Sequence, residues 1–273
     1  MATKLILCMK WGTVYGPEYV NILHAMVARN ITGPFKVVCF TDDATGIREE
    51  VMCRPLPSLG CEIPPDVPGK WPKVALWSRE LEGLEGLEGL ALFIDLDSVI
   101  VGNMDGYFTH GNPEDVITAR NWVRPFSKSG QTSVFRFQIG RHPYMLENLQ
   151  ADPANLSRKY QFEQNYVTAS IHGGIKFWPP SWTKHFGLHS MGIWPLRYLR
   201  PPVLPVGVKI VTFPGRPKPP DAIVGRWSEN TLPRRPLEQL RWVWDHRKTE
   251  KRWRKHFSRF VLPSAWVAEH WRE

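Results

Sequence analysis

Two carboxylates, Asp95 and Asp97, stand two positions apart after the apolar run at residues 91–94. A carboxylate at the end of a buried strand takes up a proton, finds a cation or binds a metal, because an unpaired buried charge is costly. Strand side chains alternate, so both carboxylates are expected on one side of the backbone. Oxygen ligands of this kind suit Mg²⁺ or Mn²⁺. The pattern favours a metal site; in the alternative, one aspartate caps a turn and the other faces solvent.

A second candidate feature is the basic loop "TFPGRPKPPD" at residues 212–221. Gly215 permits a tight turn that points backbone N–H groups outward, and Arg216 and Lys218 add two cations. Amides and an ammonium together suit the oxygens of a diphosphate. The alternative is a rigid, proline-rich surface loop whose basic residues have no ligand.

The elements that position these residues alternate between strands and helices in the first hundred residues. Strands are expected at 4–9, 35–40, 51–54 and 91–97, and helices at 18–29 and 70–81. This alternation predicts an α/β fold with a largely parallel sheet. The second half is less regular, with strands expected at 115–119, 133–137 and 208–213 and helices at 142–149 and 163–171. The triple repeat "LEGLEGLEG" at residues 81–89 is expected to be a surface loop without function.

In α/β sheets, ligands bind beyond the carboxyl ends of the strands. Three of the expected strands end in polar or aromatic residues: Lys10 with Trp11, Thr41 with Asp42, and the Asp95 motif. We expect these three strand ends to meet at one crevice.

The composition, with 42% hydrophobic and 22% charged residues, is that of a globular protein. No apolar run is long enough to span a bilayer, and the first residues are typical of a strand rather than a secretory signal. The four cysteines lack C-x-x-C spacing. A cytoplasmic protein with reduced thiols is therefore expected.

The net charge of +9 is concentrated near the carboxyl terminus. Residues 234–273 hold eleven Lys and Arg against five Asp and Glu, together with five of the thirteen tryptophans. Their apolar residues follow a helical spacing in two stripes: Leu237, Leu240 and Trp244, then Trp253, Phe257, Phe260 and Val261. Such a basic helix suits an anionic membrane surface, which would make the protein peripheral on the inner face of the cytoplasmic membrane. Packing on the rest of the chain is the alternative, and nucleic acid is disfavoured because no recognition motif accompanies the charge.

Three segments in order, "FIDLDSVIVGNMDGYF", "EQNYV" and "TFPGRPKPP", resemble the GT-A fold nucleotide-sugar glycosyltransferases. The resemblance is greatest to glycosyltransferase family 8, the glycogenin and lipopolysaccharide galactosyltransferase family, and it covers residues 1 to about 225. It implies one GT-A domain over residues 1–233, a Rossmann-like mixed sheet flanked by helices, followed by a basic, aromatic helical extension at 234–273.

The resemblance also implies a donor site. Asp95 and Asp97 would bind Mn²⁺ or Mg²⁺, and Gly215 and Lys218 would contact the donor diphosphate. Thr212 stands where the family has a histidine as third metal ligand, and Glu163 replaces an aspartate.

The remaining site residues that the resemblance implies surround the nucleotide and the sugar. Those near the nucleotide and donor phosphate are Lys10, Trp11, Tyr15, Asp42 and Lys73. The catalytic pair beside the sugar would be Gln164 and Glu163.

The activity implied is transfer of a sugar from a nucleoside-diphosphate donor, UDP-linked, to a glycan or a lipid-linked acceptor, as in bacterial glycan biosynthesis. A retaining reaction follows from family 8, whereas Glu163 acting as a base would make it inverting. The sequence leaves three alternatives. A haloacid dehalogenase-type phosphatase is disfavoured because 94 residues precede its motif, and a nucleotidyltransferase because "KWGTVYGPE" lacks a cluster of cations. A protein that binds carbohydrate without catalysis stays open because of Thr212.

Overall fold

The computed structural model describes residues 3–79, 81, 87–123 and 126–273. Most of the repeat expected to be a surface loop, residues 82–86, lies outside this range. The chain divides into two compact units. Unit 1 comprises the residues up to 96 together with 103–180, and unit 2 comprises 97–102 together with 181–273.

Unit 1 is built on a seven-stranded sheet with the order β3-β2-β1-β4-β7-β6-β8. The strands are β1 (Lys4–Lys10), β2 (Phe35–Thr41), β3 (Val51–Arg54), β4 (Leu90–Ile94), β6 (Ile117–Arg120), β7 (Gly130–Gln138) and β8 (Lys176–Phe177). The strands β3, β2, β1 and β4 run parallel to one another, whereas β7 runs antiparallel to both β4 and β6. The predicted α/β class is confirmed, and the sheet is mixed.

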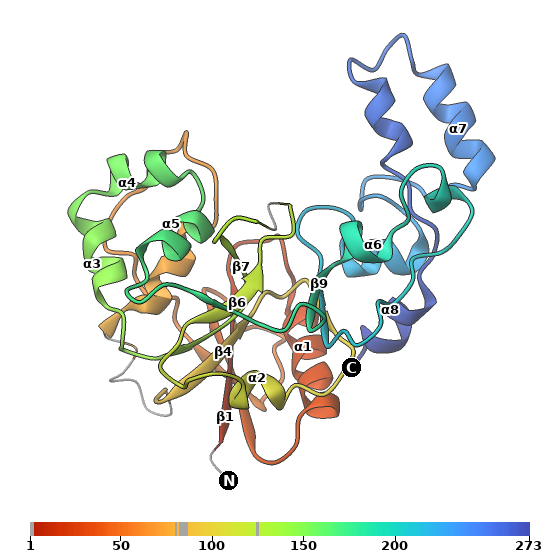
Figure 1. Ribbon diagram of the computed structural model, residues 1–273. Coiled ribbons are helices and arrows are strands. Elements are labelled where there is room, and N and C mark those ends of the chain that lie inside the picture. Colours follow the sequence, from red (N-terminus) through yellow and green to blue (C-terminus); the bar gives the residue numbers. More distant parts are fainter. Residues whose placement is uncertain (1–2, 80, 82–86, 124–125) are drawn as a thin grey trace. The chain divides into compact units, whose positions relative to one another are not determined.

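Helices flank this sheet, with α3, α4 and α5 together on one side and α1 on the other (Figure 1). The helical segments are α1 (Pro17–Asn30), the 3₁₀ helix η1 (Trp71–Trp77), α2 (Gly106–Thr109), α3 (Tyr144–Ala151), α4 (Pro153–Tyr160) and α5 (Glu163–Ser170). Helix α1 begins with Pro17, whose fixed φ suits a first helical position, and Glu18 lies in its first turn. Its apolar residues at helical spacing are buried, so packing as well as local propensity holds it.

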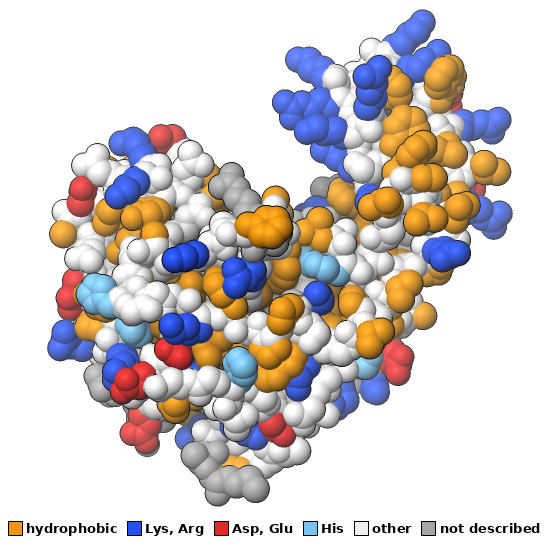
Figure 2. Space-filling model, in the orientation of Figure 1, with side chains coloured by type: hydrophobic (Ala, Val, Ile, Leu, Met, Phe, Trp, Pro, Cys, Tyr) orange, Lys and Arg blue, Asp and Glu red, His pale blue; other side chains and the backbone are white. Residues whose placement is uncertain are grey.

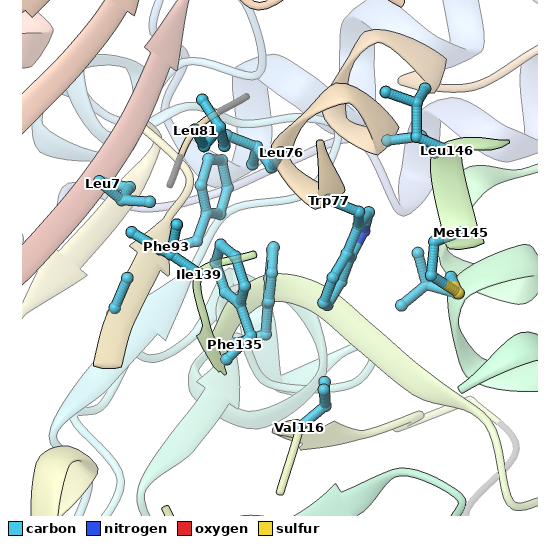
Figure 3. Packing of buried hydrophobic residues seen from close by; sticks show 14 of the residues in the cluster. Leu7, Leu76, Trp77, Leu81, Phe93, Val116, Phe135, Ile139, Met145 and Leu146 are labelled. Carbon is cyan, nitrogen blue, oxygen red and sulfur yellow. The ribbon is translucent and has the colours of Figure 1, made fainter. Parts of the chain in front are cut away.

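The core of unit 1 is rich in aromatic side chains (Figure 3). Phe93 of β4 stacks on Phe135 of β7 with ring centroids 5.1 Å apart, and Trp77 of η1 lies 5.6 Å from Phe135. Aromatic pairs at such distances add stability beyond the area they bury. They fix η1 against β7, which pairs with β4, the strand that ends beside Asp95.

Unit 2 contains a three-stranded sheet in the order β5-β10-β9, formed by β5 (Ser98–Ile100), β10 (Ile210–Thr212) and β9 (Thr183–His185). Its helical segments are η3 (Phe186–Ser190), η4 (Leu196–Tyr198), α6 (Pro219–Val224), α7 (Pro236–Asp245), η5 (Trp253–Phe257) and α8 (Ala265–His270). Gly225 ends α6 with a φ of 74°, and a Cβ there would lie 2.7 Å from Cδ of Pro263. Only glycine satisfies both the left-handed turn and this close approach.

The two apolar stripes of the basic extension differ in their packing. Phe260 and Val261 are buried, and the Phe260 ring stacks on Tyr198 with centroids 4.3 Å apart. In α7, by contrast, Leu237 is 79% exposed and Trp244 is 59% exposed. The extension therefore belongs with residues 181–233 to unit 2, while α7 keeps an open apolar stripe. The domain boundary at residue 233 stays a prediction.

None of the helices in the described part of the chain is both long and apolar enough to cross a membrane.

Candidate functional site

The carboxyl ends of β2, β1 and β4 are neighbours in the sheet of unit 1. Lys10 pairs with Thr41 in the parallel β1–β2 ladder, and Leu7 pairs with Phe93 in the β1–β4 ladder. The chain forms β2 on one side of β1 and β4 on the other, so the strand order reverses here. Such a switch point is where open α/β sheets bind ligands. The expected meeting of the three strand ends is found.

The Asp95 motif is a turn and not the end of an extended strand. Strand β4 stops at Ile94, residues 96–97 form a turn, and β5 begins at Ser98. The prediction that both carboxylates share one side of an extended backbone was therefore wrong, because alternation holds only within a strand. The boundary between the units also falls here, with Asp95 in unit 1 and Asp97 in unit 2.

In unit 1, Asp95 forms an ion pair with Lys73, whose Nζ lies 3.0 Å from Oδ1. Lys73 also donates to the carbonyl of Thr132 at 2.7 Å, and its Nζ lies 4.5 Å from the centre of the Phe93 ring. The Lys73 side chain is 5% exposed, and that of Asp95 is 31% exposed. A buried ammonium thus offsets the charge of a more open carboxylate.

The same network reaches Glu163, the first residue of α5. The hydroxyl of Thr132 donates to Oε1 of Glu163 at 2.7 Å, and Glu163 is buried. Asp95, Lys73, Thr132 and Glu163 are therefore linked in sequence by hydrogen bonds. The next residue, Gln164, is half-buried. Sequence reasoning missed Thr132, since a threonine within a strand has no feature that separates it from any other.

The residues predicted to surround a nucleotide are held by local contacts in unit 1. Lys10 is buried and donates to the carbonyl of Asp43 at 2.9 Å. Asp42 accepts a hydrogen bond from the backbone N–H of Gly12 at 2.9 Å. Both contacts fix the two loops that follow β1 and β2.

Two aromatic side chains lie in or just after the turn that follows β1. The ammonium of Lys70 lies 5.4 Å from the centre of the Trp11 ring, and the Tyr15 ring lies 4.8 Å from that of Tyr19. These contacts give the two aromatic side chains defined neighbours without showing what they bind.

In unit 2, Asp97 forms an ion pair with Lys218 on the basic loop. The Lys218 backbone N–H donates to Asp221 at 3.2 Å, at the start of α6. Gly215, three residues earlier, has a φ of 85°, and a Cβ built there would meet nothing within 4 Å. The loop therefore brings a cation to Asp97 and has open space beside its glycine.

The residues of unit 2 do not reproduce the metal ligand set that the resemblance implies. Thr212 is fully buried, and its hydroxyl donates to the carbonyl of Lys184 at 3.3 Å. Asp97 already has Lys218 as its partner. Among the described residues, no group of three His, Cys, Asp or Glu side chains is placed to hold a metal ion. The three-ligand site is therefore not a fit for this chain.

His185, which sequence reasoning did not select, is paired with Thr212 in the β9–β10 ladder. Its Nδ1 accepts a hydrogen bond from the Gly187 N–H at 2.9 Å. Burial, with His189 adding a smaller effect, lowers the pKa of His185 to about 4. His185 is therefore neutral at pH 7. Because Nδ1 accepts a hydrogen bond, Nε2 carries the proton of the neutral ring.

No protein-family model matches the chain, and no curated protein matches it in sequence. Solved structures do match. The galactosyltransferase LgtC in complex with donor and acceptor sugar analogues has a TM-score of 0.57 at 10% identity, covering 97% of this chain and 99% of LgtC. An active-site mutant of LgtC, with Glu in place of Gln, has a TM-score of 0.53 at 12% identity, over 79% of this chain and 89% of that one.

The glycosyltransferase GlyE of Streptococcus pneumoniae TIGR4 is similar over 96% of this chain and 66% of its own, with a TM-score of 0.55 at 12% identity. At such low identities the likeness establishes the fold. The chain has the GT-A fold, as the sequence resemblance predicted.

Proposed function

We propose that this GT-A fold protein is a glycosyltransferase that moves a sugar from a nucleoside diphosphate, UDP, to a glycan or a lipid-linked acceptor. The observation that carries the proposal is the pairing of Asp97 with Lys218 in a chain of this fold. A lysine on a glycine-bearing loop, next to the acidic motif, offers an ammonium to a diphosphate in exchange for its carboxylate partner. LgtC, which has this fold, was solved with donor and acceptor sugar analogues.

The nucleotide is assigned to the loops after β1 and β2. Trp11 and Tyr15 offer aromatic faces for the base, and Asp42 offers an acceptor for base or ribose. Lys10 and Asp42 both tie these loops in place, which is the support that a preorganised nucleotide site needs. Uracil is proposed from the family resemblance alone.

The sugar is assigned to the network of Lys73, Asp95 and Glu163. Thr132 holds one oxygen of Glu163, and the other oxygen is assigned to sugar or acceptor hydroxyls. Gln164 is proposed to lie at the reacting face, by analogy with the active-site Gln changed in the LgtC mutant. A retaining outcome follows from the same analogy.

Charge develops on the diphosphate as the sugar departs, and stabilising it is the largest task of the site. Lys218 would supply an ammonium, and the backbone at Gly215 would supply N–H donors. The Mn²⁺ or Mg²⁺ predicted on Asp95 and Asp97 stays a prediction, and a bound ion would add positive charge at the same diphosphate. The roles proposed for Lys73 and Lys218 do not depend on the metal ion.

The test is thermal melting with UDP, GDP, ADP and CDP, each in Mn²⁺ and in a chelator, followed by hydrolysis of UDP-sugars. We expect UDP to raise the melting temperature most. Asp97→Asn should abolish the part of the UDP shift that requires Mn²⁺, while Asp66→Asn, which removes an exposed carboxylate of unit 1, should leave the shift unchanged. A chain stabilised by no nucleotide under either condition would contradict the proposal and favour carbohydrate binding without catalysis.

We further propose that α7 lies on an anionic membrane surface, which would bring the enzyme to a lipid-linked acceptor. Leu237 and Trp244 are exposed, and basic side chains surround this part of unit 2 (Figure 2). Apolar contact and charge complementarity together favour such binding. We expect Leu237→Glu and Trp244→Glu to reduce sedimentation with phosphatidylglycerol vesicles several-fold, whereas Leu199→Glu, at another exposed leucine of unit 2, should not. Equal sedimentation of all variants would refute membrane docking.

A further inference from the structure

A pocket of about 420 Å³ lies entirely within unit 2, and none of the residues assigned above to the donor or the sugar lines it. Its walls come from the loop after α6, from α7 and from residues 256–261. Pockets that bind small molecules measure roughly 300–1,000 Å³ and combine apolar walls with a few placed polar groups. This pocket has the volume of such a site.

One wall holds an arginine in a fixed orientation. The guanidinium carbon of Arg234 lies 4.5 Å from the centre of the Trp242 ring, and its Nη1 donates to Oε1 of Gln239 at 3.2 Å. Gln239 is 3% exposed, and its Nε2 donates to the carbonyl of His256 at 3.0 Å. A buried amide and an indole thus orient a planar cation, the arrangement that reduces the cost of binding an anion.

The charge of the pocket has no carboxylate to balance it. Arg234 and Arg259 both line it, and the lining residues include no Asp or Glu. Within the described part of the chain, neither arginine forms an ion pair with a carboxylate. His256 also lines the pocket. Its Nε2 lies 3.6 Å from Oε2 of Glu250, a residue that does not line the pocket. Two arginines lining one cavity favour an anionic ligand, and a guanidinium binds phosphate through paired hydrogen bonds.

The other walls suit a saccharide. Trp227 and Trp242 supply indole surface, while Ser228 and Asn230 supply hydroxyl and amide groups. Trp242 has Arg234 over its ring and His246 stacked on it at 4.3 Å, so it is a fixed wall, whereas Trp227 is half-buried. Indole surface with hydrogen-bonding groups beside it accommodates the mixed apolar and polar faces of a sugar ring.

We propose that this pocket binds a phosphorylated saccharide, with the phosphate between Arg234 and Arg259 and the sugar ring against Trp227. The shared chemistry is a hexose carrying a phosphate, whether free in solution or at the end of a glycan. The proposal does not depend on glycosyl transfer, because none of these residues belongs to the proposed donor site.

Isothermal titration tests the proposal with glucose 6-phosphate, inorganic phosphate and glucose as probes, in excess UDP so that the proposed donor site does not take up the phosphate. A phosphorylated disaccharide forms a further arm. Tighter binding of glucose 6-phosphate would indicate a free hexose phosphate as the ligand, and tighter binding of the disaccharide would indicate the phosphorylated end of a glycan. We expect glucose 6-phosphate to bind at least tenfold more tightly than inorganic phosphate, and glucose not to bind measurably.

Arg259→Gln and Trp227→Leu should each weaken glucose 6-phosphate binding by about tenfold or more. Arg259 is exposed, so its replacement leaves the fold intact, and circular dichroism checks this for both variants. Arg252→Gln removes an exposed cation of the same segment that does not line the pocket, and it should bind as the unaltered chain does. The proposal is overturned if the unaltered chain does not bind the sugar phosphate, if phosphate alone binds as tightly, or if the pocket variants bind normally. UDP binding, measured separately, reports on the donor site whichever of these results is found.

Discussion

The two carboxylates of the acidic motif have opposite surroundings in the two units. In unit 1 the cation is the buried partner, with Lys73 5% exposed against 31% for Asp95. In unit 2 the anion is at least as buried as the cation, with Asp97 10% exposed against 14% for Lys218. One unit therefore presents a carboxylate and the other an ammonium. Asp95 and Asp97 are the same residue type, yet they differ in exposure because each pairs with a different lysine.

The difference follows from what holds each lysine. Lys73 lies among the Phe93 and Phe135 rings and donates to the Thr132 carbonyl. Lys218 lies at the start of a short helix, after a loop with open space at Gly215. We expect Lys73 to act mainly on stability and Lys218 mainly on ligand binding. Four measurements would break or sharpen this comparison.

The largest expected effect is that of Lys73→Met on stability. Methionine keeps the apolar contacts but removes the hydrogen bonds from Lys73 to Asp95 and to the Thr132 carbonyl, which should lower the free energy of unfolding by about 2–3 kcal/mol. Urea denaturation measures this. Lys36→Met, at an exposed position of β2, is the matched control and should change stability by less than about 0.5 kcal/mol. If the two variants were equally stable, Lys73 would not be a structural cation.

Lys218→Met should act on the ligand instead. Loss of one charge-assisted hydrogen bond to phosphate costs about 2 kcal/mol, which is roughly a 30-fold weaker affinity for UDP. The buried Asp97 carboxylate also loses the ammonium of Lys218, which should lower the free energy of unfolding by about 1–2 kcal/mol, less than in Lys73→Met, where the Thr132 carbonyl loses a bond as well. Calorimetric titration with UDP gives the affinity, and Lys184→Met in β9 is the control within the same unit. An unchanged UDP affinity in Lys218→Met would remove the distinction between the two lysines.

Acid should weaken unit 2 through His185. Its pKa is about 4 in the folded chain against an ordinary 6.5, so the folded state disfavours the charged form. The contribution of neutral His185 is therefore complete above pH 6.5 and is lost as the pH falls toward 4. Protonation of Nδ1 would also break its bond from Gly187, for a loss of about 1–2 kcal/mol. Denaturation at pH 7 and pH 4.5 should show a smaller decrease for His185→Gln, and an identical decrease would refute this account.

The smallest expected effect is that of Thr212→Val. The variant loses the bond to the Lys184 carbonyl, which should cost about 1 kcal/mol or less. UDP binding in Mn²⁺ should stay as it was, because the buried hydroxyl is directed at the backbone. A loss of metal-dependent UDP binding would instead make Thr212 a ligand and would restore the three-ligand site.

Much of unit 1 could be predicted from the sequence. The strands at 4–9, 35–40 and 51–54 and the helix at 18–29 match β1, β2, β3 and α1 to within a residue or two. Continuous apolar runs and helical spacing are local properties, so the sequence alone reveals them. The segment at 70–81 was expected to be helical and contains the shorter 3₁₀ helix η1.

Strands β5, β8 and β9 were not predicted. Each has two or three residues, too few for a periodic pattern, and exists because a distant strand pairs with it. Helix α4 was also missed, since its Pro153 start and polar composition resemble a loop. The turn at 96–97 could not be read from "FIDLDSV" for a similar reason, because the apolar residues continue through it.

The sequence alone determined the types of the reactive side chains, the strand that ends beside Asp95 and the basic loop around Lys218. The tertiary structure decided which cation meets which anion. Lys73 is 22 residues from Asp95, and Lys218 is 121 residues from Asp97. No local pattern encodes contacts over such separations, since packing and strand pairing bring them together only in the folded chain. The same holds for the Thr132 bridge to Glu163 and for the fixed Arg234 of the unit 2 pocket.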